Sequence, residues 1–263
     1  MTICISLLCE NDEVALIGAD RMVTDRGLPI EFETSDSKYK QYRSEQVEFA
    51  ISSAGVALPP STIHRAVSSS VDEIETLLQV VNLVKKTYIN IKQKKFEEEF
   101  LEQRGISFEE FYDSGMHNSG RGETWDKFYS DFELNLDVIV SGLDQRGANT
   151  YRVSDGGAFD GLTESFESIG FDAIGSGSNL ARDTLTSRYS RDLSVEEGLY
   201  VLYAALQNSS QAPGVGSEFD ITVIDSSGPR EIQAEEIATL NKAFYDMEEA
   251  NPYPEAIGEQ LDI

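Results

Sequence analysis

The second residue of the chain is a threonine, and its position after the initiator methionine makes it a candidate nucleophile. Removal of Met1 would leave Thr2 with a hydroxyl that can attack a carbonyl and a free α-amine beside it. Such an amine has an ordinary pKa of about 7.7 to 8.0, so it can accept the hydroxyl proton near neutral pH without a histidine. Residues 3–9 are mostly apolar, as in a buried strand, and would hold the nucleophile at the end of a rigid element. We therefore expect Thr2 to act as an N-terminal nucleophile.

An acidic residue is expected close to Thr2. Residues 14–19 form a second apolar run, and the polar stretch 11–13 before it is typical of a tight turn. The two strands would pair antiparallel and bring Asp20, at the end of the second strand, back toward the start of the chain. A charge at the end of a buried strand is usually a solvated cap, but this one would face the candidate nucleophile.

The composition is that of a globular and strongly acidic protein. Of 263 residues, 21 are Lys or Arg and 47 are Asp or Glu, which gives a formal net charge of -26. A charge of this sign repels nucleic acids and anionic membrane surfaces, so neither is expected as a partner. The hydrophobic share of 40% is sufficient for a sizeable core.

Few residues could bind a metal or form a Ser-His-Asp triad. The chain has two cysteines, Cys4 and Cys9, and two histidines, His64 and His117. The cysteines lie on one short strand, where they cannot easily bridge each other, and buried thiols are expected. We therefore expect neither a cofactor nor a metal. Residues 1–9 lack a basic segment and acids interrupt the apolar run, so no signal peptide or membrane span is predicted and a cytoplasmic location is expected.

The pattern along the chain predicts strands, two helices, strands, two helices, a strand and a last helix. Hairpins grouped between helix pairs do not fit a regular βαβ series; they predict an α+β fold of antiparallel sheets covered by helices. Two capping boxes, at residues 70–73 and 194–197, would each open a helix. We expect a single domain over residues 1–250, with a helical excursion at about 85–130 and an acidic tail at 251–263.

Several short motifs occur in one order across residues 2–225. They are Thr2 with the strand after it, Gly18-Ala19-Asp20-Arg21-Met22-Val23-Thr24, Lys38 before an apolar strand, Ser53-Ala54-Gly55, Ile174-Gly175-Ser176-Gly177-Ser178 and Phe219-Asp220-Ile221-Thr222-Val223-Ile224. In this order, and at nearly this spacing, they resemble the proteasome β-subunit family of N-terminal nucleophile (Ntn) hydrolases, with its uncharacterised proteasome-like branch. Each motif is weak alone, and together they are fairly specific.

The resemblance implies a four-layer αββα sandwich, with two antiparallel sheets between helix layers. In the family a terminal threonine attacks, an aspartate and a lysine support it, and a glycine amide forms the oxyanion hole. The matching positions here are Thr2, Asp20, Lys38 and Gly55, and Ser176 matches the serine that hydrogen-bonds the terminal amine. The resemblance thus implies a proteasome-like threonine peptidase or amide hydrolase with a peptide or protein substrate, assembled as a homo-oligomeric ring; an unfoldase partner is left open.

The physical roles of these residues agree with the resemblance. The ammonium of Lys38 would lower the pKa of a nearby α-amine and hydroxyl, and Asp20 would pair with that ammonium and fix it. The amide of Gly55, with no side chain in the way, could approach a developing oxyanion. Lys40 is the alternative to Lys38, but the apolar residues after Lys38 follow the family's pattern. Thr24 resembles the residue whose backbone pairs with an extended substrate.

Other functions stay open. The family has an aspartate and a serine in the loop after its second late helix, but residues 209–215 contain no acid, so a noncatalytic ring-forming or scaffold protein is an alternative. The same nucleophile could also pass its acyl group to an amine, as in a transpeptidase or ligase. Residues 175–181 imitate a dinucleotide-binding loop, although the hairpins before them do not fit the opening of a parallel sheet.

Overall fold

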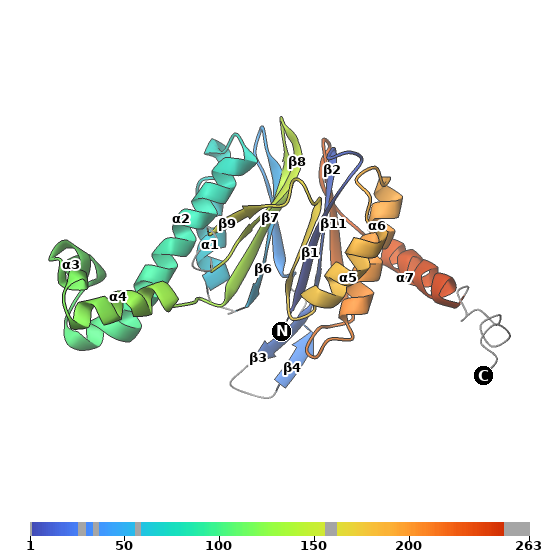
Figure 1. The fold of residues 1–263 in the computed structure, drawn as a ribbon. Coiled ribbons are helices and arrows are strands. Elements are labelled where there is room, and N and C mark those ends of the chain that lie inside the picture. Colours follow the sequence, from blue (N-terminus) through green and yellow to red (C-terminus); the bar gives the residue numbers. More distant parts are fainter. Residues whose placement is uncertain (1, 26–29, 34–36, 56–58, 156–161, 250–263) are drawn as a thin grey trace, which may run out of the picture.

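Two five-stranded antiparallel sheets form the centre of the computed structural model, which describes residues 2–25, 30–33, 37–55, 59–155 and 162–249 (Figure 1). In spatial order, the first sheet consists of β10 (Phe171–Gly175), β1 (Ile3–Cys9), β2 (Val14–Asp20), β11 (Phe219–Asp225) and β12 (Gly228–Glu231). The second consists of β5 (Tyr39–Arg43), β6 (Glu48–Gly55), β7 (Leu136–Asp144), β8 (Gly147–Val153) and β9 (Thr163–Ser165). A separate two-stranded sheet pairs β3 (Met22–Asp25) with β4 (Ile30–Glu33).

The hairpin predicted at the start of the chain is confirmed. β1 and β2 pair antiparallel, with Cys4 opposite Ala19 and Cys9 opposite Val14. Every residue of both strands is buried, because each strand has a neighbour on either side and a packed layer on either face. This double burial explains why the two segments are continuous apolar runs instead of alternating patterns. Asp20, at the end of β2, is thereby returned to the beginning of β1.

Helices cover the outer face of each sheet, so the predicted α+β sandwich with two antiparallel sheets between helix layers is confirmed (Figure 1). One layer holds α1 (Pro59–Ser68) and α2 (Leu77–Phe96), and the other holds α5 (Ser178–Arg188), α6 (Val195–Ser209) and α7 (Ala234–Glu249). None of the described helices combines the length and the apolar character needed to cross a bilayer.

The contact layer between the two sheets contains buried hydroxyl groups among small apolar residues. The Ser6 Oγ on β1 lies 2.6 Å from the Ser141 Oγ on β7 and 2.8 Å from the Thr150 Oγ1 on β8. All three side chains have 0% exposure, so these mutual hydrogen bonds satisfy polar atoms that water does not reach. The small apolar residues of the layer include Cys4, Ala15, Ala19, Ala50, Ala54 and Ala148.

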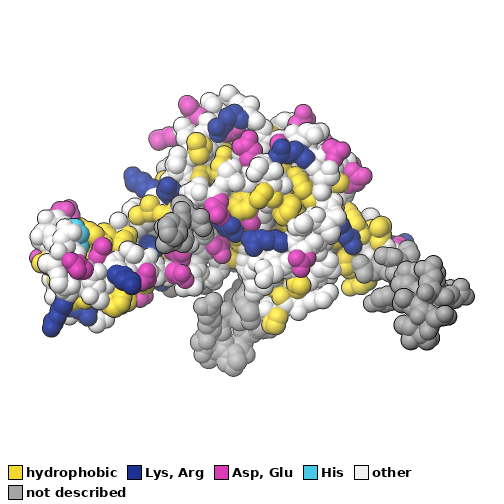
Figure 2. All heavy atoms as spheres, in the orientation of Figure 1, with side chains coloured by type: hydrophobic (Ala, Val, Ile, Leu, Met, Phe, Trp, Pro, Cys, Tyr) yellow, Lys and Arg dark blue, Asp and Glu magenta, His cyan; other side chains and the backbone are white. Residues whose placement is uncertain are grey.

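A helical excursion leaves the sandwich at the end of α2 (Figure 1). It continues through η2 (Glu97–Leu101), η3 (Glu102–Arg104), α3 (Phe108–Asp113), η4 (Met116–Asn118) and α4 (Arg121–Asp131). Phe96, Leu101 and Phe111 form a small core of its own, which other aromatic residues surround. Figure 2 shows acidic side chains scattered over the sandwich and this excursion, with Lys and Arg between them and no continuous basic patch on the face in view. The division into one domain stays a prediction, and residues 251–263 lie outside the described part of the chain.

The first predicted capping box is wrong, and the second is confirmed. Ser70 makes no capping hydrogen bond through its side chain and precedes only a short 3-10 turn, η1 (Val71–Glu73). The box that opens α2 is formed by Thr76 and Gln79 instead. A carboxylate from β7 helps to set this start, because Asp144 Oδ2 accepts a hydrogen bond of 2.8 Å from the N–H of Leu77. The second box, formed by Ser194 and Glu197, opens α6 as expected.

Candidate active site

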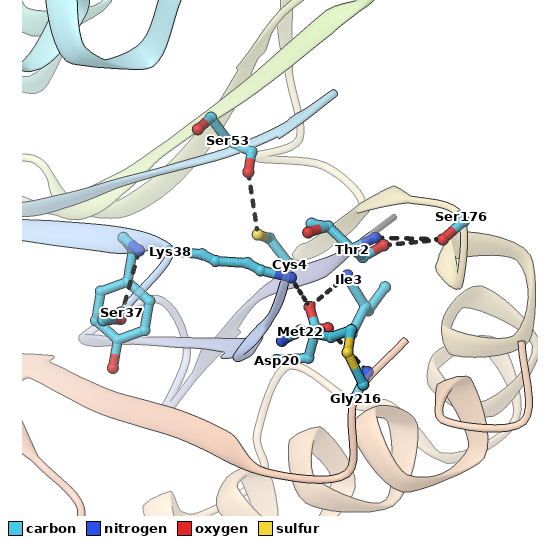
Figure 3. Close-up of polar contacts among 11 residues, drawn as sticks. Thr2, Ile3, Cys4, Asp20, Met22, Ser37, Lys38, Ser53, Ser176 and Gly216 are labelled. Carbon is cyan, nitrogen blue, oxygen red and sulfur yellow. Dashed lines mark hydrogen bonds and ion pairs between the residues drawn. The ribbon is translucent and has the colours of Figure 1, made fainter. Parts of the chain in front are cut away.

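The buried carboxylate of Asp20 is the centre of the candidate site (Figure 3). Its Oδ1 accepts hydrogen bonds from the N–H of Ile3 at 2.9 Å and from the ammonium of Lys38 at 2.6 Å. Its Oδ2 accepts from the N–H of Met22 at 3.2 Å and of Gly216 at 2.9 Å. The side chain has no exposed surface, so these four donors replace the water that the carboxylate loses on folding. One of them belongs to the residue directly after Thr2.

The structure shows which of the two candidate lysines contacts Asp20. Lys38 lies just before β5, and its side chain is 12% exposed where it reaches Asp20. Lys40 is exposed to solvent. In the ladder of the second sheet it stands opposite Ile51, which packs in the core on the helix side of that sheet. The Lys38 side chain therefore connects the second sheet to the first, and Lys40 does not.

Thr2 and Ser176 contact each other through the backbone of Thr2. The N–H of Thr2 donates a hydrogen bond of 3.3 Å to the Ser176 hydroxyl. The same hydroxyl donates to the Thr2 carbonyl oxygen at 3.4 Å. Gly175 makes this approach possible, because a Cβ on it would lie 2.1 Å from the Thr2 carbonyl oxygen. Its φ of +102° also favours glycine. Thr2 itself is only 9% exposed.

Gly55 ends β6 on the same side of the sandwich as Thr2. The Cβ of its neighbour Ala54 lies 3.4 Å from the position that a Cβ on Gly175 would take, next to Thr2. Gly55 has a φ of +120°, and a Cβ there would lie 2.0 Å from the Asn135 carbonyl oxygen. Only glycine fits this backbone without displacing its neighbour.

Comparisons with known proteins find related sequences and a similar fold. No family model matches the chain. A proteasome subunit beta from Methanosarcina barkeri is 25% identical over 178 residues, which cover 67% of this chain and 74% of that protein. A proteasome subunit beta 1 from Korarchaeum cryptofilum is 32% identical over 113 residues, which cover 43% of this chain and 52% of that protein.

The chain is a relative of the proteasome subunits. The resemblance predicted from its motifs is thus confirmed. Among solved structures, Anbu (ancestral beta-subunit) from Yersinia bercovieri superposes with a TM-score of 0.66 at 10% sequence identity, with 95% of both chains covered. At this identity the likeness establishes the fold alone.

In this proteasome relative, the loop after α6 supports the site with backbone groups. Residues 209–215 contain no acid, and the group that the loop region offers to Asp20 is the N–H of Gly216. Ser209 Oγ donates to the Gly177 carbonyl at 3.2 Å, and Val215 packs against the same glycine. The loop thereby supports the turn that carries Ser176. A main-chain donor has no side-chain signature, so the sequence did not indicate Gly216.

Cys4 is a second potential nucleophile near Asp20, but its thiol is protonated. Burial, the largest effect, raises its pKa to about 12, although the nearby charge of Lys38 lowers it. Its Sγ lies 3.6 Å from the Ser53 carbonyl oxygen, which is consistent with a weak thiol donor. Because the thiolate is the reactive form, this cysteine is inert near neutral pH.

The remaining site residue, Thr24, lies in β3 and stands opposite Glu31 of β4. Its pairing with an extended substrate stays a prediction. Among the described residues, no cluster of three or more His, Cys, Asp or Glu side chains could hold a metal ion.

Proposed function

We propose that this proteasome relative is an N-terminal threonine hydrolase that cleaves amide bonds of peptides or proteins, with Thr2 as the nucleophile after removal of Met1. The observation that carries the proposal is the buried Asp20 carboxylate, which binds both the Lys38 ammonium and the N–H of Ile3 beside the nucleophile. Burial of this ion pair costs desolvation free energy. Buried ion pairs of this kind are typical of functional sites.

The proposed reaction begins with attack of the Thr2 hydroxyl oxygen on a substrate carbonyl carbon. The freed α-amine takes the hydroxyl proton, and the Lys38 charge favours this transfer by stabilising developing negative charge. The Gly55 amide stabilises the oxyanion, a contribution of about 10²- to 10³-fold in rate for a typical donor. Protonation of the leaving amine gives an acyl ester on Thr2, which water then hydrolyses. Ser176, already in contact with the Thr2 nitrogen, orients the amine.

Intact mass spectrometry tests the proposal in two steps. The mass of the purified protein shows whether Met1 has been lost, and incubation with a threonine-directed covalent inhibitor should then add the mass of one adduct. Thr2→Ser keeps a hydroxyl and should still form the adduct, whereas Thr2→Ala should not. An unmodified wild-type protein that has lost Met1 would contradict the proposal.

A noncatalytic scaffold of the same fold is the second candidate, because residues 209–215 lack the acid that the family has in this loop. Wild-type protein that assembles yet forms no adduct would favour it. The same adduct followed by transfer to an added amine, in preference to water, would instead indicate a transpeptidase or ligase.

We also propose that the chain forms a homo-oligomeric ring, since its relatives are named as proteasome subunits. Light scattering in solution should give a multiple of the chain mass of 29.1 kDa. A monomer at all concentrations would contradict ring formation. It would not contradict the proposed chemistry of Thr2, which the adduct experiment tests separately.

A further inference from the structure

The strand that delivers Lys38 lies at the edge of its sheet. β5 has a single neighbour in the second sheet, β6, so the sheet fixes it from one side only. Asp20, the partner of Lys38, belongs to the first sheet, where it stands opposite Phe219 of β11. The geometry of the pair therefore depends on whatever holds β5 against the first sheet.

Two polar side chains of β5 meet one hydroxyl of the first sheet. Thr222 lies on β11, opposite Ile17 of β2 in the ladder. Its Oγ1 is 2.9 Å from the Tyr39 hydroxyl and accepts a hydrogen bond of 2.8 Å from the Gln41 amide nitrogen. Tyr39 directly follows Lys38 in the chain, so this contact is one residue from the ammonium-bearing side chain.

These hydrogen bonds lie in an enclosed place. Thr222 is 0% exposed and Tyr39 is 3% exposed. Burial raises the pKa of the Tyr39 hydroxyl, which stays neutral and able to donate or accept. If β5 slid along or away from β11, the Thr222 and Tyr39 hydroxyls would lose their partners in a region that water does not reach. An unsatisfied buried polar group costs about 1 to 3 kcal/mol, so the contact opposes such movement.

We propose that Thr222 is a positioning residue, which through Tyr39 and Gln41 holds β5 at the place where Lys38 reaches Asp20 beside the nucleophile. The inference rests on the proposed function, because it assigns Thr222 an effect on the reactivity of Thr2. A displacement of about 1 Å in a catalytic group can cost about 10²-fold in rate, so an edge strand that carries such a group benefits from a second attachment.

Thr222→Val tests the proposal, since valine keeps the shape of threonine and removes the hydroxyl. With the threonine-directed inhibitor, we expect the maximal modification rate, kinact, to fall at least about tenfold while the inhibitor constant, KI, stays unchanged. Thr222→Ser restores the hydroxyl and should recover most of kinact. Unchanged kinact in Thr222→Val, with the wild type reactive, would overturn the inference and leave the proposed function intact.

Thr150→Val is the matched control. Thr150 is also 0% exposed and its hydroxyl also lies between the sheets, but it bonds to Ser6 and Ser141. We expect this variant to lose stability in urea unfolding with kinact unchanged. A fall of kinact equal to that in Thr222→Val would show a general effect of buried hydroxyl loss and overturn the inference.

A second variant covers the case in which Thr222→Val does not fold. Tyr39→Phe removes only the other hydroxyl of the contact and should reduce kinact in the same direction; unchanged kinact would overturn the inference. If both variants fold, their effects should be less than additive, because both remove the same hydrogen bond. A wild-type protein without Met1 that forms no adduct would overturn the proposed function and this inference with it.

Discussion

The ammonium of Lys38 lies 2.6 Å from the carboxylate of Asp20, a side chain with no exposed surface. Asp20 ends β2 of the first sheet and Lys38 directly precedes β5 of the second, so the two side chains meet only when the two sheets pack together. Removing one member of a buried pair costs about 3 to 5 kcal/mol when the charge left behind has no other partner. Asp20 would still have backbone donors without Lys38.

Asp20→Asn should reduce the reactivity of Thr2. The amide keeps the size of the carboxylate but loses the charge that holds Lys38. We expect kinact with the threonine-directed inhibitor to fall at least about 10²-fold. The free energy of unfolding, measured in urea, should fall by about 3 kcal/mol or more.

The control for Asp20 is Asp172→Asn. Asp172 is 1% exposed and forms an ion pair with Arg182 at 3.2 Å, without contact to Thr2 or Lys38 among the described hydrogen bonds. This variant should also be less stable, but its kinact should match that of the wild type. If kinact fell equally in both variants, the loss of reactivity in Asp20→Asn would be explained by reduced stability alone.

Lys38→Ala should abolish acylation of Thr2 and leave the fold largely intact. The Asp20 carboxylate would keep its three backbone N–H donors, so part of its desolvation remains compensated. Lys40→Ala changes an exposed lysine two residues away and should leave acylation unchanged. Wild-type kinact in Lys38→Ala, measured by intact mass over time, would refute the proposed site.

Gly55→Ala should impair both stability and reactivity. The new Cβ would lie 2.0 Å from the Asn135 carbonyl oxygen, on a backbone with a φ of +120°. We expect a loss of unfolding free energy of at least about 3 kcal/mol, from strain and steric overlap together. The displaced amide should also lower kinact if Gly55 forms the oxyanion hole.

Gly105→Ala provides the comparison. Gly105 also has a left-handed backbone, with a φ of +69°, but a Cβ there would meet nothing within 4 Å. The Gly105→Ala substitution should lower the free energy of unfolding by about 1 kcal/mol and leave kinact unchanged. A Gly55→Ala variant as mild as Gly105→Ala would show that the close approach to Asn135 is relieved at little cost.

Cys4 should be unreactive toward thiol reagents in the folded protein at pH 8. Its folded pKa of about 12 lies above the ordinary value of 9.0. The stability from the buried neutral thiol is complete below pH 9 and is lost as the pH rises toward 12, because the unfolded chain ionises first. Urea should expose the thiol to the reagent, and Cys4→Ala should keep Thr2 reactive. Rapid native labelling of Cys4 would contradict its burial.

Local patterns were sufficient for much of the fold. The apolar runs of β1 and β2 predicted their pairing, and residues 194–197 predicted the start of α6, because pairing and capping here involve neighbours in the chain. The box at residues 70–73 failed for the opposite reason. Ser70 precedes only a 3-10 turn, and α2 begins at Leu77, whose N–H donates to Asp144 of a strand distant in the sequence.

The sequence by itself indicated the resemblance to proteasome subunits, the candidate nucleophile and the two charges expected to support it. Only the tertiary structure decided which lysine meets Asp20, that the N–H of Gly216 completes the carboxylate's set of partners, and that Thr222 holds the strand next to Lys38. These contacts join residues far apart in the chain, and one of them uses a backbone group. Periodicity reports which face of an element is buried, but the partner that a side chain meets there depends on how the two sheets are placed against each other.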